Sequence, residues 1–209
     1  MKLTAADDRK HAWRVHEIAR DFTLLDVWGF PIRADPARHE TFDDFARIVA
    51  ANGPATGSAI TDWLLALRTK LGATFGWDRR NHALSIPGCR ETSLAARLTD
   101  ADRARNRAAE LHPMWHPVVD LRVVYFFEDE ALVELSNDTV HALLHLGWVD
   151  APENASFKTP QMAIYIKSRG VMTKLYMGII EPFRFVFVYP MWIRCITQAW
   201  NTKVRDRRG

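Results

Sequence analysis

The residues whose type and spacing most directly suggest chemistry are His141 and His145, four positions apart in the stretch from Thr139 to Val149. This stretch is rich in branched and aromatic residues, which predicts a strand. Residues four apart in a strand share a face but stand about 13 Å apart, whereas the nitrogen ligands of zinc lie about 2 Å from the metal. We therefore expect no metal ion shared by this pair.

A second, wholly apolar face of the same strand indicates how the histidines point. Its residues are Val140, Ala142, Leu144, Leu146 and Trp148. Because this face suits the core better than the other one, we expect the histidines to point outward or to lie under a lid formed by residues 78–112. From either position they could contact a bound molecule.

Glu181 and Arg184 form a charged pair inside an apolar stretch near the C-terminus. Three residues apart on a helix, they can pair along its surface. Alternatively, Arg184 lies at the mouth of a cavity and binds a carboxylate or phosphate through its planar guanidinium. The sequence leaves both interpretations open.

Three tyrosines complete the set of candidate residues, since each offers a ring to an apolar wall and a hydroxyl to a partner. Packing in the core is the competing interpretation for them, as it is for the large tryptophans. The candidate ligand-binding residues are Tyr125, His141, His145, Trp148, Tyr165, Tyr176 and Arg184. No catalytic residue is assigned, and we expect no metal and no cofactor.

The elements that position these residues begin with a strand from Phe22 to Ile32, placed at a sheet edge because Pro31 has no N–H. Residues 41–52 predict a short amphipathic helix, and a second helix follows from about residue 57 to residue 76. Residues 78–112 are polar and arginine-rich, and we expect them to form an insertion or a lid.

An antiparallel meander follows, because the apolar pattern changes to period two with short polar turns. The strands are predicted over residues 119–127, 131–136, 139–149 and 161–167. Residues 172–200 then predict a long helix bent at Pro182 and Pro190. Its longest uncharged run, residues 185–193, is about half of what crosses a bilayer, so we expect no transmembrane span.

These elements predict an α+β fold of the helix-grip type, in which a curved antiparallel sheet wraps around a long C-terminal helix. Two short helices follow the first strand. A curved sheet and a helix do not match along their whole length, so we expect a cavity between them.

Composition limits the class of protein. A chain of 209 residues with 48% apolar residues suits a single domain, here residues 1–209. Its net charge of +3 is accounted for by a basic tail, residues 201–209, so nucleic-acid binding is not expected.

Two cysteines form no disulfide framework, which predicts a cytoplasmic protein. An alternative places Trp192, Trp200 and the tail on an anionic membrane.

Three stretches resemble the bacterial domain of unknown function 2867 family: SNDTVHALLHLGWV, QMAIYIKSRGVMTKLYMG and IIEPFRFVFVYPMWIRCITQAW. The earlier stretches DFTLLDVWGFPI and ITDWLLALRTKLGATFGW look like the N-terminal half of that family. The resemblance extends over about residues 12–77 and 115–200, and the step Pro182-Phe183-Arg184 is its most distinctive piece. Such families are similar to the START-like, helix-grip superfamily, whose members hold lipids, hormones or polyketide-like molecules in a cavity. The resemblance implies this fold and no particular activity.

The function expected from these observations is binding of a small hydrophobic or amphipathic molecule between the sheet and the C-terminal helix. The alternative is an enzyme of the cyclase or hydratase kind, with a tyrosine or histidine of the same cavity as general acid or base. The oligomeric state and the identity of the ligand do not follow from the sequence.

Overall fold

The structure, a computed structural model, describes residues 1–53, 93–111, 121–136, 140–168 and 188–207. Its centre is a curved six-stranded sheet in which each strand is antiparallel to its neighbours, in the order β1-β2-β6-β5-β4-β3. The strands are β1 (Lys2–Leu3), β2 (Thr23–Gly29), β3 (Leu121–Phe126), β4 (Glu130–Ser136), β5 (Val140–Ala151) and β6 (Asn154–Ser168). The predicted four-stranded meander is confirmed as β3 to β6.

The first predicted strand, β2, is not at the edge of the sheet. Lys2 and Leu3 of β1 pair with Trp28 and Val27 outside it, and the proline expected to mark an edge, Pro31, lies beyond its end. A two-residue strand has no periodic signal, so the sequence did not reveal β1.

Strand β6 begins at Asn154, seven residues before the predicted start, and contains Pro160, which has no N–H to donate within the sheet. The carbonyl of Pro160 accepts a hydrogen bond from the Phe30 N–H (3.0 Å). Pro160 has no N–H that could donate to the carbonyl of Phe30. The hydroxyl of Thr159 donates a hydrogen bond to this carbonyl instead (3.3 Å). The proline is therefore tolerated where it faces the end of β2.

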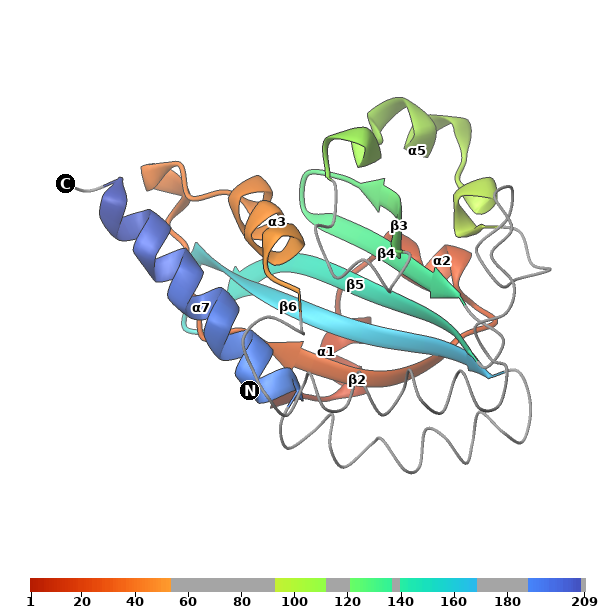
Figure 1. Ribbon diagram of the computed structural model, residues 1–209, viewed down its shortest axis with the longest axis horizontal. Coiled ribbons are helices and arrows are strands. Elements are labelled where there is room, and N and C mark those ends of the chain that lie inside the picture. Colours follow the sequence, from red (N-terminus) through yellow and green to blue (C-terminus); the bar gives the residue numbers. More distant parts are fainter. Residues whose placement is uncertain (54–92, 112–120, 137–139, 169–187, 208–209) are drawn as a thin grey trace, which may run out of the picture.

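One face of the sheet, here called the helix face, carries α3 (Phe42–Ala51) and α7 (Tyr189–Asp206), with η1 (Pro36–Arg38) before α3 (Figure 1). The buried side of α7 packs on α3 and the sheet through Trp192, Ile193, Ile196 and Trp200. Arg194, Gln198 and Asn201 are exposed on the other side of α7. The expected helix over residues 57–76 and the expected bent segment up to residue 187 lie outside the described residues.

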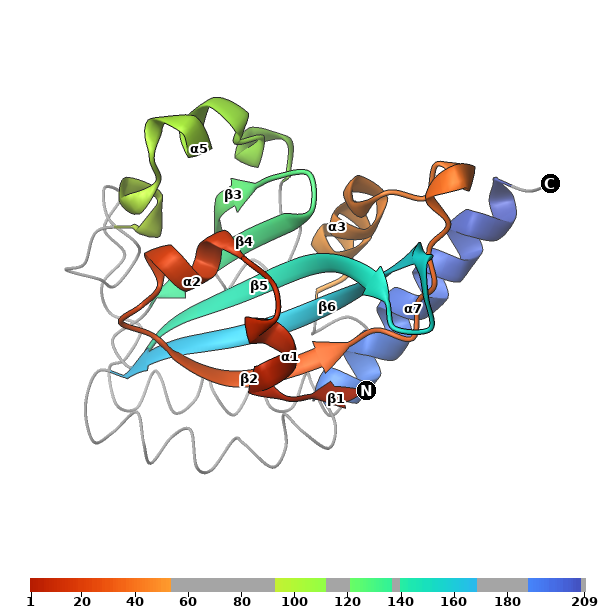
Figure 2. The same cartoon turned by 180° about the vertical axis from the view of Figure 1, so that it is seen from behind.

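The opposite face, here called the cover face, lies under α1 (Ala5–Arg9) and α2 (Arg14–Ile18) (Figure 2). It also carries η2 (Leu94–Arg97) and α5 (Asp100–Arg105), whereas η3 (Ala108–Glu110) lies at the edge strand β3 and contacts α3 through Glu110 and Arg47. Thr99 and Asp102 form the capping box at the start of α5. The described part of the polar segment, residues 93–111, is thus an ordered cover over one end of the sheet.

Residues 201–206 of the expected tail belong to α7, and Arg207 follows as its C-cap. Lys203 and Arg207 each bind the carboxylate of Asp44 at the start of α3, both at 2.7 Å. The side chains of Trp192 and Trp200 are buried, with 4% and 3% of their surface exposed, so neither can contact a membrane surface. The described elements together form an α+β fold of the helix-grip kind, with both faces of the sheet covered.

Candidate functional site

The structure brings four of the predicted site residues together on the cover face. Tyr125, His141, His145 and Tyr165 all point to this side and are at most 5% exposed. Trp148 lies on the helix face, in an aromatic cluster with Phe42, Phe45 and Trp200. Tyr176 and Arg184 lie outside the described residues.

Glu130, at the start of β4, is the centre of the first polar cluster. Its carboxylate accepts hydrogen bonds from the Tyr125 hydroxyl (2.7 Å) and from the backbone N–H of Arg14 (2.9 Å), and it lies 3.0 Å from Nε2 of His145. Burial alone would raise the pKa of Glu130, but these bonds lower it below its ordinary value. Burial and the nearby charge of Glu130 raise the pKa of Tyr125. The cluster therefore holds an ionised carboxylate and a protonated tyrosine at neutral pH.

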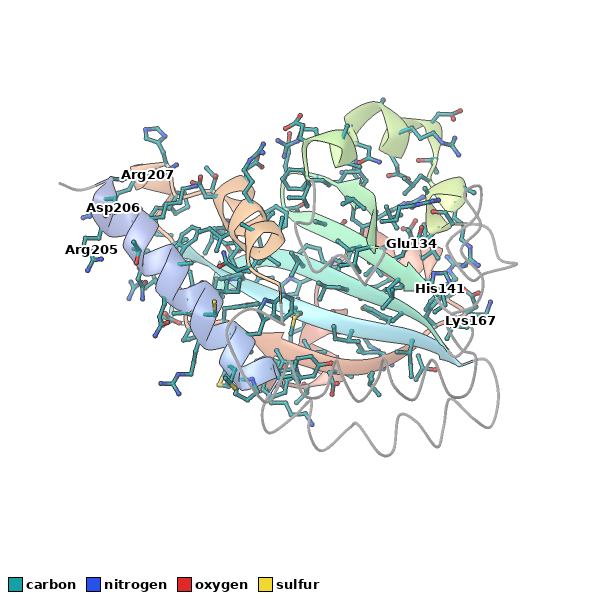
Figure 3. The ribbon with its side chains drawn as sticks, viewed as in Figure 1. Glu134, His141, Lys167, Arg205, Asp206 and Arg207 are labelled. Carbon is teal, nitrogen blue, oxygen red and sulfur yellow. The ribbon has the colours of Figure 1, made fainter. Side chains whose placement is uncertain are left out.

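A second cluster surrounds Glu134, four residues along the same strand. Its carboxylate accepts hydrogen bonds from the Ser93 hydroxyl and the Leu94 N–H (3.1 Å), and it lies 3.3 Å from Nε2 of His141. Glu134 and His141 are 0% and 1% exposed. Figure 3 shows both at one end of the sheet, near Lys167.

The third cluster involves Asp8 of α1. The Tyr165 hydroxyl donates to Oδ2 of Asp8 (2.7 Å), and Nε2 of His16 lies 2.7 Å from the same oxygen. Burial and this hydrogen bond raise the pKa of Tyr165. The side chain of Asp8 is 1% exposed, so the carboxylate is enclosed between α1 and the sheet.

The three clusters share one arrangement: a buried carboxylate joins a strand to a covering segment. Asp8 and Glu130 fix α1 and α2, and Glu134 fixes η2. Aromatic rings close the clusters, since Trp13 lies 5.1 Å from His145 and Phe22 4.9 Å from His141. Both histidines are thus covered. His141 lies beside Glu134, which also binds η2 of the predicted lid, whereas His145 lies beneath Trp13 of the N-terminal segment, a cover that was not expected.

Sequence reasoning missed the three carboxylates. A signal for one of them was available. Glu134 points away from the face of Val133 and Leu135, and in the pairing of β4 with β5 it lies on the same face as His141 and His145. Asp8 gave no signal, because its partner Tyr165 is 157 residues away in the sequence.

A charged hollow of about 420 Å³ lies beside the first cluster, lined by Trp13, Arg14, Asp129 and Glu130 among others. Arg14 is held there by Asp102, at 2.8 Å. Burial and the charge of Glu130 raise the pKa of Asp129. This hollow is polar, unlike the cavity expected between the sheet and the C-terminal helix.

The helix face carries an apolar surface away from α7. It consists of half-buried side chains on four adjacent strands, paired as Leu121–Leu135–Ala142–Ile166 and flanked by Val123 and Ile164. The residues behind them on the cover face, Glu134, His141, Leu143 and Tyr165, are 0–5% exposed. We call these six side chains the apolar floor.

In the described ranges, no three His, Cys, Asp or Glu side chains are grouped so that they could hold a metal ion. The helices within those ranges are also too short or too polar to cross a membrane.

Comparison with known proteins gives a family and no characterised relative. No curated protein and no solved structure matches the chain. The family described as protein of unknown function (DUF2867) matches residues 18–191, which include β2 to β6, α3 and the start of α7. The match covers most of the chain, and the protein therefore belongs to the DUF2867 family.

Proposed function

We propose that this protein binds a small hydrophobic or amphipathic molecule between the sheet and the C-terminal helix, as a START-like domain. The observation that carries the proposal is the apolar floor. Six apolar side chains on one face of β3, β4, β5 and β6 are only half-buried, whereas the residues behind them are fully buried. Small-molecule sites are mostly apolar, with few polar anchors.

The packing around α7 supports this location. Trp192, Ile196 and Trp200 fill the space between α7 and the sheet at one end, so the two surfaces are in direct contact there. The floor lies on the same face toward the other end of β5 and β6. A ligand would therefore lie along the strands beside the aromatic cluster. Tyr176 and Arg184 stay proposed contacts in this scheme.

Binding is favoured over catalysis by what the buried tyrosines and histidines do. Tyr125 and His145 contact Glu130, and His141 contacts Glu134, all on the face opposite α7. A hydratase or cyclase would need such a group beside the apolar floor. We assign these side chains to anchoring the cover, and we propose no reaction for them.

We place the protein in the cytoplasm and propose no nucleic-acid partner. The proposal of no nucleic-acid partner is supported by ion pairs that already involve several basic side chains of the protein. Arg97 pairs with Asp21, Arg107 with Asp43, and Arg207 with Asp44.

The test is a variant that fills the space above the floor. Ala142 lies between Leu135 and Ile166, and Ala142→Phe places a ring there. We expect native mass spectrometry of the wild-type protein from its own host to show a bound small molecule that Ala142→Phe lacks. The control Ala96→Phe adds the same ring at an exposed position of η2 and should retain the ligand. Equal occupancy in Ala142→Phe and the wild type would overturn the proposal, as would a wild type without ligand.

A further inference from the structure

A hollow of about 500 Å³ lies on the cover face, at the end of the sheet where β5 turns into β6. This volume is within the range of small-molecule sites. Its walls come from β1, from the segment after β2 and from the β5–β6 hairpin. The apolar part of the lining includes Leu3, Phe30, Pro31, Ile32, Val149 and Pro160.

The lining contains a buried amide nitrogen that has no hydrogen-bond partner among the residues that the structure describes. Gln161, in β6, is 3% exposed, and its Nε2 has no hydrogen-bond acceptor among the described residues. Its cross-strand neighbours are Gly29 and Gly147, which have no side chains to offer one. A buried amide without a partner is destabilising. Because the last torsion of a glutamine is soft, the amide can turn its N–H groups to an acceptor placed in the hollow.

The rim adds a fixed positive charge. Arg33 lines the hollow, and its guanidinium carbon lies 3.7 Å from the centre of the Phe157 ring. In the part of the chain that the structure describes, no carboxylate pairs with Arg33. The neighbouring Lys10, in contrast, pairs with Asp7 at 2.7 Å.

Two of the three acidic side chains in the lining, Asp7 and Asp150, already bind a lysine. Asp7 is held by Lys10, and Asp150 is held by Lys158 at 2.6 Å. Glu153 is exposed at the turn of the hairpin. The hollow thus combines an apolar wall, an amide donor inside it and a guanidinium at its rim.

We propose that this hollow is a separate binding site for a small amphipathic carboxylate. The apolar chain packs against Leu3, Pro31 and Ile32. The carboxylate accepts hydrogen bonds from the amide of Gln161, and Arg33 supplies the opposite charge. The site lies on the other side of the sheet from the apolar floor and does not depend on it.

The test uses octanoate as the probe, with calorimetric titration and thermal unfolding of the full chain. Gln161→Leu removes the amide and keeps an apolar side chain of similar size. We expect octanoate affinity to fall about tenfold, the worth of one hydrogen bond to a charged group, while the melting temperature of the free protein rises. The matched control Gln198→Leu, on the exposed side of α7, should change neither. If the amide has only a structural role, Gln161→Leu will lower the melting temperature and leave the affinity for octanoate unchanged. That result would overturn the proposal.

A second variant tests the charge and does not alter the buried interior. Arg33→Gln should weaken octanoate and leave the affinity for octanamide as it is in the wild type; equal effects on both probes would contradict a carboxylate site. Ala142→Phe, which fills the apolar floor, should bind octanoate like the wild type. Loss of octanoate in that variant would place the molecule on the helix face and overturn this proposal without touching the proposed function.

Discussion

The carboxylate of Glu130 joins Tyr125 and His145 of the sheet to the backbone N–H of Arg14 in the N-terminal segment. Replacing it in Glu130→Gln leaves the size unchanged but removes the charge that Tyr125, His145 and the Arg14 N–H share. At least one buried donor then loses its acceptor. We expect a loss of about 2–3 kcal/mol in the free energy of unfolding, measured by urea denaturation. Glu128→Gln, an exposed change in the same turn, should stay within about 0.5 kcal/mol.

The same residue predicts a pH dependence. The pKa of Glu130 is lower in the folded protein than its ordinary value, so its contribution is present above the ordinary pKa of a glutamate, about 4.3. It is lost as the pH falls through the lower folded value. We expect the stability difference between the wild type and Glu130→Gln to be constant near pH 7 and to shrink below about pH 4.3. A difference that grows on acidification would contradict this assignment.

Two glycines provide a paired test of packing on the cover face. A Cβ added at Gly147 would lie 2.7 Å from Cζ2 of Trp13, whereas one added at Gly29 would lie 3.4 Å from Cδ1 of Leu3. Gly147→Ala should therefore cost about 1–3 kcal/mol, as overpacking does. Gly29→Ala should be neutral or stabilising by up to about 1 kcal/mol. Thermal unfolding measures both, and equal effects would mean that Trp13 does not pack on Gly147.

Among single residues, those with local patterns could be predicted, and those with distant partners could not. The alternation along β5 correctly gave the two faces, because paired side chains repeat every second residue. It could not show that the histidine face is also buried. That burial depends on Trp13, Phe22 and Leu94, which are distant in the sequence from the strand that they cover.

At the scale of elements, one acidic residue connects the two helices of the helix face. Burial alone would raise the pKa of Asp44, but hydrogen bonds from Arg207 and Lys203 lower it. Asp44 also belongs to the capping box of α3, with Thr41. Asp44→Asn should cost about 1–2 kcal/mol and increase hydrogen exchange over residues 201–207. Asp206→Asn, an exposed change at the same end of α7, should leave exchange unchanged.

The elements that were predicted well have strong local signals. Thr41 and Thr99 each begin a helix with an acid three residues later, which is the capping box that the sequence shows directly. The limits of β6 were missed because Pro160 interrupts the pattern, and a hydroxyl from Thr159 makes that proline acceptable. The tertiary contact decided the boundary, and it had no local signature.

At the scale of the whole molecule, the sheet is covered on both faces, and the two covers differ in chemistry. The helix face packs through aromatic and aliphatic side chains such as Phe45, Trp148 and Trp200. The cover face combines apolar residues with the carboxylates of Asp8, Glu130 and Glu134. The sequence predicted the first cover from the apolar C-terminal segment. It did not predict the second, because α1 and α2 have five residues each and too few turns to show a period.

The cover face therefore makes a prediction about the N-terminal segment, although the family match begins only at residue 18. Removal of residues 1–20 would expose the surface that Trp13, Val15 and Ile18 bury, and would leave Glu130 without the Arg14 N–H. The free energy of unfolding should fall by about 5 kcal/mol or more, which is comparable with the whole stability of a typical domain. We expect this truncated protein to lose cooperative unfolding in urea. Removal of residues 203–209 deletes Lys203 and Arg207, which bind Asp44 at the surface. It should lower the urea midpoint by an amount equivalent to about 1–2 kcal/mol and keep the transition cooperative. A protein without residues 1–20 that unfolds at the wild-type midpoint would show that the carboxylate clusters do not hold the fold together.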